Sequence, residues 1–97
     1  MLDLTRINIR TFEVKFSDST TLILNPPKIK VLKKIMSVAS TNNIEDLITG
    51  IALILNSNKN DKKINEKWVE DNITFDEMLS LTKEYFTWVT EIQNNPN

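Results

Sequence analysis

Residues 12–27, FEVKFSDSTTLILNPP, decide the fold that we expect for the start of the chain. Apolar and charged side chains alternate over residues 12–16, as is typical of a strand that buries one face. The next residues, SDS, favour a turn, and a second apolar run follows over residues 20–24. A strand, a turn and a second strand in this order predict a β-hairpin over about residues 7–24.

Asn25-Pro26-Pro27 ends the second strand, because proline cannot donate a hydrogen bond to a sheet and fits the first turn of a helix. Apolar residues then recur at helical spacing, which predicts helices at about residues 27–40, 43–56, 65–71 and 75–93. A lone hairpin is marginally stable, so we expect it to pack on these helices. The sequence therefore predicts a single α+β domain over residues 1–97, an N-terminal β-hairpin followed by a small bundle of about four helices.

The second predicted helix is the most apolar of the four, so we expect it to be the central and most buried one. Gly50 falls inside this helix, although glycine lowers helix stability relative to alanine. We interpret Gly50 as a place where another backbone comes close, with a neutral substitution as the alternative.

The composition excludes most familiar catalytic designs. The 97 residues include no cysteine and no histidine. Disulfides, thiolate and imidazole metal sites, thiol nucleophiles and serine–histidine triads are therefore excluded. A single glycine also excludes glycine-rich phosphate loops. We expect a protein that is not an enzyme and that uses no cofactor and no metal.

Charge and hydropathy set further expectations. A net charge of −1 gives no overall attraction to nucleic acid. We interpret the lysines of the first helix as a solvated face: Lys28, Lys30, Lys33 and Lys34. The opening MLDLTRINIR lacks the pattern of a signal peptide, and no apolar run is long enough to cross a bilayer. We expect a cytoplasmic protein without a membrane or nucleic-acid partner.

Five carboxylates crowd into a short stretch around the start of the last helix: Glu66, Glu70, Asp71, Asp76 and Glu77. An enzyme would need some of them to converge with a lysine or tyrosine in a pocket. Helix capping accounts for more of them, because Thr74 followed by Glu77 makes a capping box and Asn65 can cap the preceding helix. We therefore interpret the cluster as the ends of two helices.

The last predicted helix carries more apolar surface than one small core requires. One stripe at helical spacing should face the core, and a second stripe lies beside it. Tyrosine and tryptophan are favoured at interfaces, so we predict a partner-binding surface formed by Leu53, Leu81, Tyr85, Trp88 and Ile92. Two alternatives stay open. Tyr85 and Trp88 could complete the core beneath the hairpin, or the stripe could pair two copies of the chain.

Three stretches carry a resemblance to a known family: FSDSTTLILNPPKIKVLKKI, IEDLITGIALILNSNK and KKINEKWVEDNITFDEMLSLTKEYFTWV. In their pattern and order, over about residues 12–89, the chain resembles the small tail assembly chaperones of phages and phage-tail-like elements of Gram-positive bacteria. The helix start at Asn25-Pro26-Pro27 is among the most telling features. No catalytic signature belongs to the resemblance.

The resemblance implies a non-enzymatic role in the cytoplasm of a bacterial host. Members of this family coat the tape-measure protein before tail-tube subunits polymerise around it, and some members are extended by ribosomal frameshifting. The implied partners are therefore the tape-measure protein and the tail-tube protein, and we expect an apolar helix of the client to be buried reversibly. The alternative is a small regulatory or inhibitory module that binds a host or phage protein through the same surface.

Overall fold

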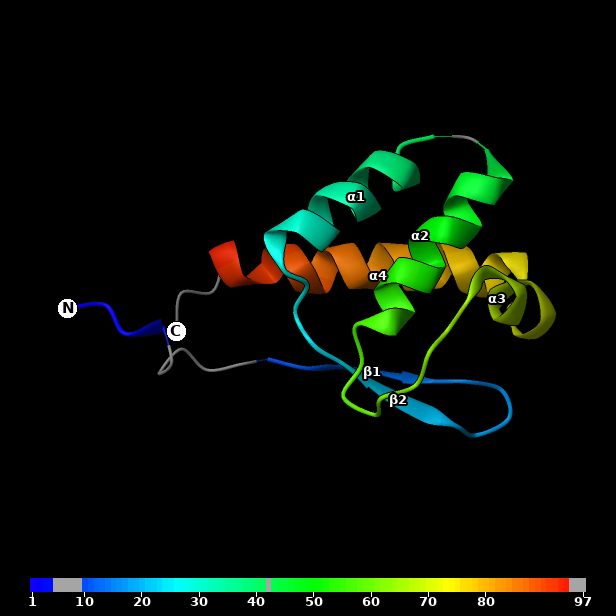
Figure 1. The fold of residues 1–97 in the computed structure, drawn as a ribbon, viewed down its shortest axis with the longest axis horizontal. Helices are drawn as coiled ribbons and strands as arrows, with labels where there is room; N and C mark the ends of the chain where they lie inside the picture. The colour runs from blue at the N-terminus through cyan, green and yellow to red at the C-terminus, as the bar shows by residue number, and fades with distance from the viewer. Residues whose placement is uncertain (5–9, 42, 95–97) are drawn as a thin grey trace.

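The hairpin and the four helices expected from the sequence are present (Figure 1). The computed structural model describes residues 1–4, 10–41 and 43–94, and of residues 92–94 the backbone alone. In chain order the elements are β1 (Phe12–Lys15), β2 (Thr21–Leu24), α1 (Ile29–Ala39), α2 (Ile44–Asn56), α3 (Glu66–Asn72) and α4 (Phe75–Asn94). The predicted α+β class is confirmed, while the predicted start of the hairpin at residue 7 lies outside the described residues. In the described part of the chain, no helix combines the length and apolar character needed to cross a membrane.

The turn of the hairpin fixes which face of each strand is buried. The Phe16 carbonyl accepts a hydrogen bond from the Ser19 amide at 2.9 Å, and the Phe16 amide donates to the Thr20 carbonyl at 2.8 Å. Ser19 has φ 73°, the left-handed conformation that a turn with one extra residue requires. In the resulting register Val14 lies opposite Leu22, so the apolar sides of both strands share one face.

The loop that follows α2 covers the outer edge of β2. The Ile23 carbonyl accepts from the Lys59 amide at 2.8 Å, and the Ile23 amide donates to Asn60 Oδ1 at 3.0 Å. Asn58 closes this loop on itself by donating from Nδ2 to the Lys62 carbonyl at 2.9 Å. A polar segment thus satisfies both backbone groups of Ile23 at this sheet edge.

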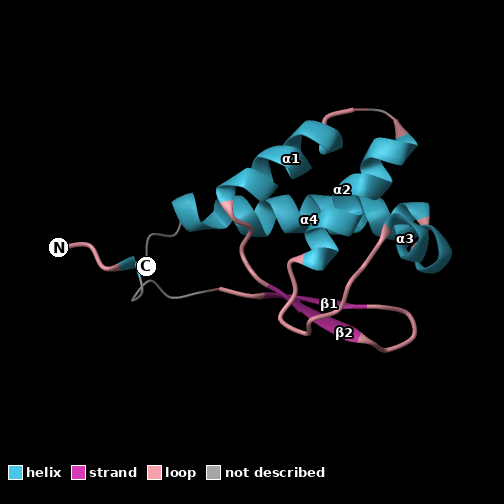
Figure 2. Ribbon diagram, in the orientation of Figure 1, coloured by secondary structure: helices cyan, strands magenta, loops and turns pink. Residues whose placement is uncertain are grey.

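α2 is the central helix, as predicted. Its buried residues are Ile48, Gly50, Ile51, Ala52, Ile54 and Leu55. Figure 2 shows α2 crossing α4, with α1 above α4 and the hairpin below it. The hairpin, α1, α3 and α4 complete the core with fully buried side chains, among them Leu22, Leu24, Ile35, Val69 and Tyr85. Burial of apolar surface on both sides of α2 is what holds the hairpin to the helices.

Gly50 lies where α2 meets α1. A Cβ atom built on Gly50 would lie 3.0 Å from Val38 Cγ2, closer than ordinary van der Waals contact. The interpretation that another backbone comes close is therefore wrong, because the neighbour of Gly50 is a side chain of α1.

α1 begins two residues later than predicted. Its N-cap is Lys28, which has an extended backbone with φ −70° and ψ 156°. Pro26 and Pro27 precede this cap, so the expectation that a proline lies in the first turn is wrong. The residue before a proline is driven toward extended backbone, which keeps Pro26 out of the helix.

Candidate protein-binding groove

Two residues of the predicted partner surface lie in the core instead. Tyr85 is 0% exposed and Trp88 is 8% exposed. Phe12 of β1 covers both rings, with its centroid 6.4 Å from that of Tyr85 and 5.4 Å from that of Trp88. The Arg10 guanidinium lies 5.0 Å from the Trp88 ring centroid, and Arg10 Nη1 donates to the Trp88 carbonyl at 2.8 Å. The structure therefore corrects the prediction: Tyr85 and Trp88 complete the core beneath the hairpin.

The hairpin explains why α4 needs so wide an apolar face. β1 turns Phe12, Val14 and Phe16 inward, and all three pack against the buried core. The second stripe of α4 supplies apolar neighbours for these side chains, so much of it is not surplus.

The other predicted residues have different positions. Leu53 is half-buried and packs against the core. Leu81 is half-buried and lines a groove between α4 and β1. Ile92 belongs to α4, but its side chain lies outside the described residues. Leu81 is therefore the predicted residue that the structure places in a candidate site.

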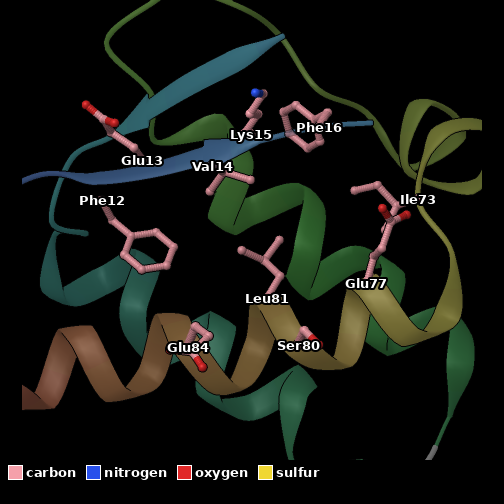
Figure 3. Close-up of a pocket in the computed structure, with 10 residues that line it drawn as sticks. All are labelled: Phe12, Glu13, Val14, Lys15, Phe16, Ile73, Glu77, Ser80, Leu81 and Glu84. Carbon is pink, nitrogen blue, oxygen red and sulfur yellow. The ribbon is translucent and has the colours of Figure 1, made fainter. Parts of the chain in front are cut away.

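The candidate site is an apolar groove of about 280 Å³ between β1 and α4 (Figure 3). Its floor consists of half-buried apolar side chains: Phe12, Val14, Phe16, Ile73 and Leu81. Its rim carries exposed polar and charged side chains: Glu13, Lys15, Glu77, Ser80 and Glu84. Figure 3 shows Leu81 pointing from α4 toward Val14. We call these ten residues the β1–α4 groove.

An aromatic contact supports the Phe16 end of the β1–α4 groove. The Phe16 ring packs edge-on against the Trp68 ring of α3, with centroids 5.1 Å apart. Asn65 positions Trp68 by capping α3, since Asn65 Oδ1 accepts from the Trp68 amide at 2.8 Å. The predicted Asn65 cap is confirmed, and it caps the helix whose Trp68 ring packs against Phe16 of the groove floor.

The rim of the groove is acidic. Glu13, Glu77 and Glu84 line it, and Lys15 is its basic residue. Glu77 Oε1 accepts from the Thr74 amide at 2.8 Å, while the Glu77 amide donates to Thr74 Oγ1 at 3.1 Å. The predicted capping box is confirmed, and it fixes the position of the Glu77 carboxylate. Because the rim charges are exposed, they can orient a partner but contribute little binding energy each.

The carboxylates around α3 and the start of α4 are all exposed. Asp71 Oδ2 pairs with Lys67 Nζ at 3.2 Å on the exposed side of α3. Among the residues that the structure describes, no three acidic side chains lie close enough together to hold a metal ion. The carboxylates occupy helix ends and exposed faces.

A second hollow, of about 260 Å³, lies on the other side of Ile73 between α2, α3 and α4. Ile44 and Phe75 at its edge are 51% and 53% exposed. This hollow is less apolar than the β1–α4 groove and has no strand beside it. The β1–α4 groove is therefore the stronger candidate for binding an apolar partner.

Sequence reasoning missed four residues of the groove floor: Phe12, Val14, Phe16 and Ile73. The alternation over residues 12–16 marked the strand residues as an apolar face. It did not reveal that this face would remain partly uncovered, because that depends on where α4 lies.

The fold and the groove define a small α+β protein with an apolar, acid-rimmed groove on its surface. The chain matches no protein-family model, and no solved structure matches it. It is similar to Protein OPG061 of Monkeypox virus, with 32% identity over 74 residues. The similar region is 75% of this chain and 30% of that protein, so the chain spans less than a third of its relative's length.

Proposed function

We propose that the chain is a non-enzymatic tail assembly chaperone that binds the tape-measure protein, tail-tube subunits or both during tail morphogenesis. The open β1–α4 groove carries this proposal, because a protein that holds an aggregation-prone client needs exposed apolar surface. The resemblance of residues 12–89 to this family supports the same role.

The size of the groove suits reversible binding. Covering an apolar side chain contributes on the order of 1.5–3 kcal/mol, and the groove can take only a few. Association costs at least about 4 kcal/mol in lost freedom of movement. The net gain per groove is small, so a client segment can leave when tail-tube subunits compete for it.

Co-purification with the tape-measure protein of the same genome tests the proposal. Leu81→Lys removes apolar surface from the groove floor and places there a charge that a bound client would strip of water, which costs free energy. We expect the recovery of tape-measure protein on the tagged chain to fall by about tenfold or more, since each 1.4 kcal/mol is a factor of ten.

Leu79→Lys is the matched control for this experiment. It makes the same change on the same helix, but Leu79 is 46% exposed and does not line the groove. Recovery should stay at the level of the unsubstituted chain. Undiminished recovery with folded Leu81→Lys, or equal loss with both variants, would contradict the proposed site.

The second candidate function is a small regulatory or inhibitory binding module. Such a module would bind a host or phage protein through the same β1–α4 groove. Gene neighbourhood distinguishes the two. A chaperone gene should lie between the tail-tube and tape-measure genes, whereas a regulatory module should be encoded elsewhere.

A further inference from the structure

β1 has an edge that no described residue covers. In an antiparallel pair, residues alternate between those whose backbone groups face the partner strand and those whose groups face away. The amide and carbonyl of Phe16 both bond across the turn, so the amide and carbonyl of Val14, two residues earlier, also point toward β2. The amides and carbonyls of Glu13 and Lys15 therefore point away from β2, and no described residue bonds to them.

The two edges of the hairpin thus differ. On the edge of β2, the loop after α2 bonds to both backbone groups of Ile23, through the Lys59 amide and the Asn60 side chain. An uncovered edge is a ready template for pairing with another chain, which is why most proteins cover or blunt such edges. In this chain, the edge of β1 that no described residue covers borders the β1–α4 groove.

The open edge and the groove form one surface. Figure 3 shows Glu13 and Lys15 on one side of β1, with Phe12 and Val14 on the other side toward α4. A strand added antiparallel to β1 would have its side chains on the same two faces in alternation. Every second side chain would enter the groove above Leu81, and the others would face solvent.

The acidic rim indicates the charge of such a strand. Glu84 lies beneath the Phe12 end of the groove, and Glu77 lies beside Ile73 at the other end (Figure 3). A basic side chain at each end of an added strand would therefore meet a carboxylate.

We propose that the β1 edge and the β1–α4 groove bind an extended segment of the client as a third strand, antiparallel to β1. Alternate apolar side chains of that segment fill the groove, and basic residues flank them. This inference rests on the proposed chaperone function and adds the conformation and chemistry of the bound segment. A second copy of the chain is the alternative occupant, and sedimentation distinguishes it from a client.

A synthetic peptide tests the strand pairing. The probe is a blocked peptide in which valine alternates with threonine between terminal lysines. In the proposed register the valine side chains enter the groove, while the threonine amides donate to β1. N-methylation of the threonine amides removes these donors, and N-methylation of the valine amides is the matched control.

Calorimetric titration of the unsubstituted chain gives the readout. We expect methylated threonines to weaken binding about tenfold or more, because two hydrogen bonds of about 1 kcal/mol each are lost. Methylated valines should have little effect, and terminal glutamates in place of lysines should weaken binding about threefold through lost charge complementarity.

Several results would overturn the proposal. Failure of the unmodified probe to bind, equal binding of the threonine-methylated probe, or weakening by the valine methyl groups alone would each exclude this pairing. Self-association of the chain that the probe reverses, measured by sedimentation, would make a second copy the natural occupant. If the client bound the groove as a helix, Leu81→Lys would still reduce recovery of the tape-measure protein, whereas the peptide experiment would fail. The proposed function and the strand pairing are therefore tested separately.

Discussion

Tyr85 combines complete burial with a hydroxyl that has no hydrogen-bond partner among the described residues. Its ring contacts those of Phe12, Phe86 and Trp88, with centroids 6.4, 5.7 and 5.7 Å away. Burial raises the pKa of Tyr85 from 10.0 to about 12, because an ionised phenol is costly away from water. The ring stabilises the core, whereas the hydroxyl opposes its own burial.

Tyr85→Phe should therefore raise the free energy of unfolding by about 1 kcal/mol, since it keeps the ring and removes an unpaired polar group. It should also change the pH dependence of stability. The unfolded tyrosine loses its proton near pH 10.0 and the folded one near 12. Its titration therefore leaves the free energy of unfolding unchanged below pH 10 and lowers it as the pH rises from 10 to 12. The phenylalanine variant should lack this fall.

Urea unfolding of both proteins below and within that pH window measures the difference. Tyr85→Ala is the control for loss of the ring and should lower the free energy of unfolding by about 3–5 kcal/mol. The same decline with pH in the unsubstituted chain and in Tyr85→Phe would show that Tyr85 is not its source.

At the scale of elements, signals within one helix could be predicted and contacts between distant elements could not. Thr74 and Glu77 are three residues apart, so their capping box follows from the sequence and is confirmed. The burial of Trp88 depends on Phe12 near the other end of the chain, which no spacing within α4 reveals. Among the predicted partner residues whose side chains the structure describes, Leu81 alone lines the groove. The rest of the floor could not be predicted, because it combines residues of β1 with residues near α4.

The contact between α1 and α2 can be tested at Gly50. Alanine favours a helix over glycine by about 1 kcal/mol, but its Cβ would lie 3.0 Å from Val38 Cγ2. We expect Gly50→Ala alone to raise the free energy of unfolding by less than this amount. In a Val38→Ala background the same change should raise it by the full amount. A double-mutant cycle measures the coupling, and additive effects would show that Val38 does not limit the approach.

In the whole molecule, the two edges of the hairpin differ in what covers them. The loop after α2 bonds to Ile23 on the edge of β2, and we propose that a client pairs with the edge of β1. α4 serves both parts, since Tyr85 lies in the core and Leu81 in the groove. Substitutions at Leu81 should therefore reduce binding while leaving the core in place.

Amide hydrogen exchange of the chain, free and bound to the tape-measure protein, shows whether the client pairs with β1. We expect slower exchange at the amides of Glu13 and Lys15 in the complex, unchanged exchange in α1, and no such protection with Leu81→Lys. Unchanged exchange in β1, together with protection confined to α1 or to the hollow beside Ile44 and Phe75, would contradict it.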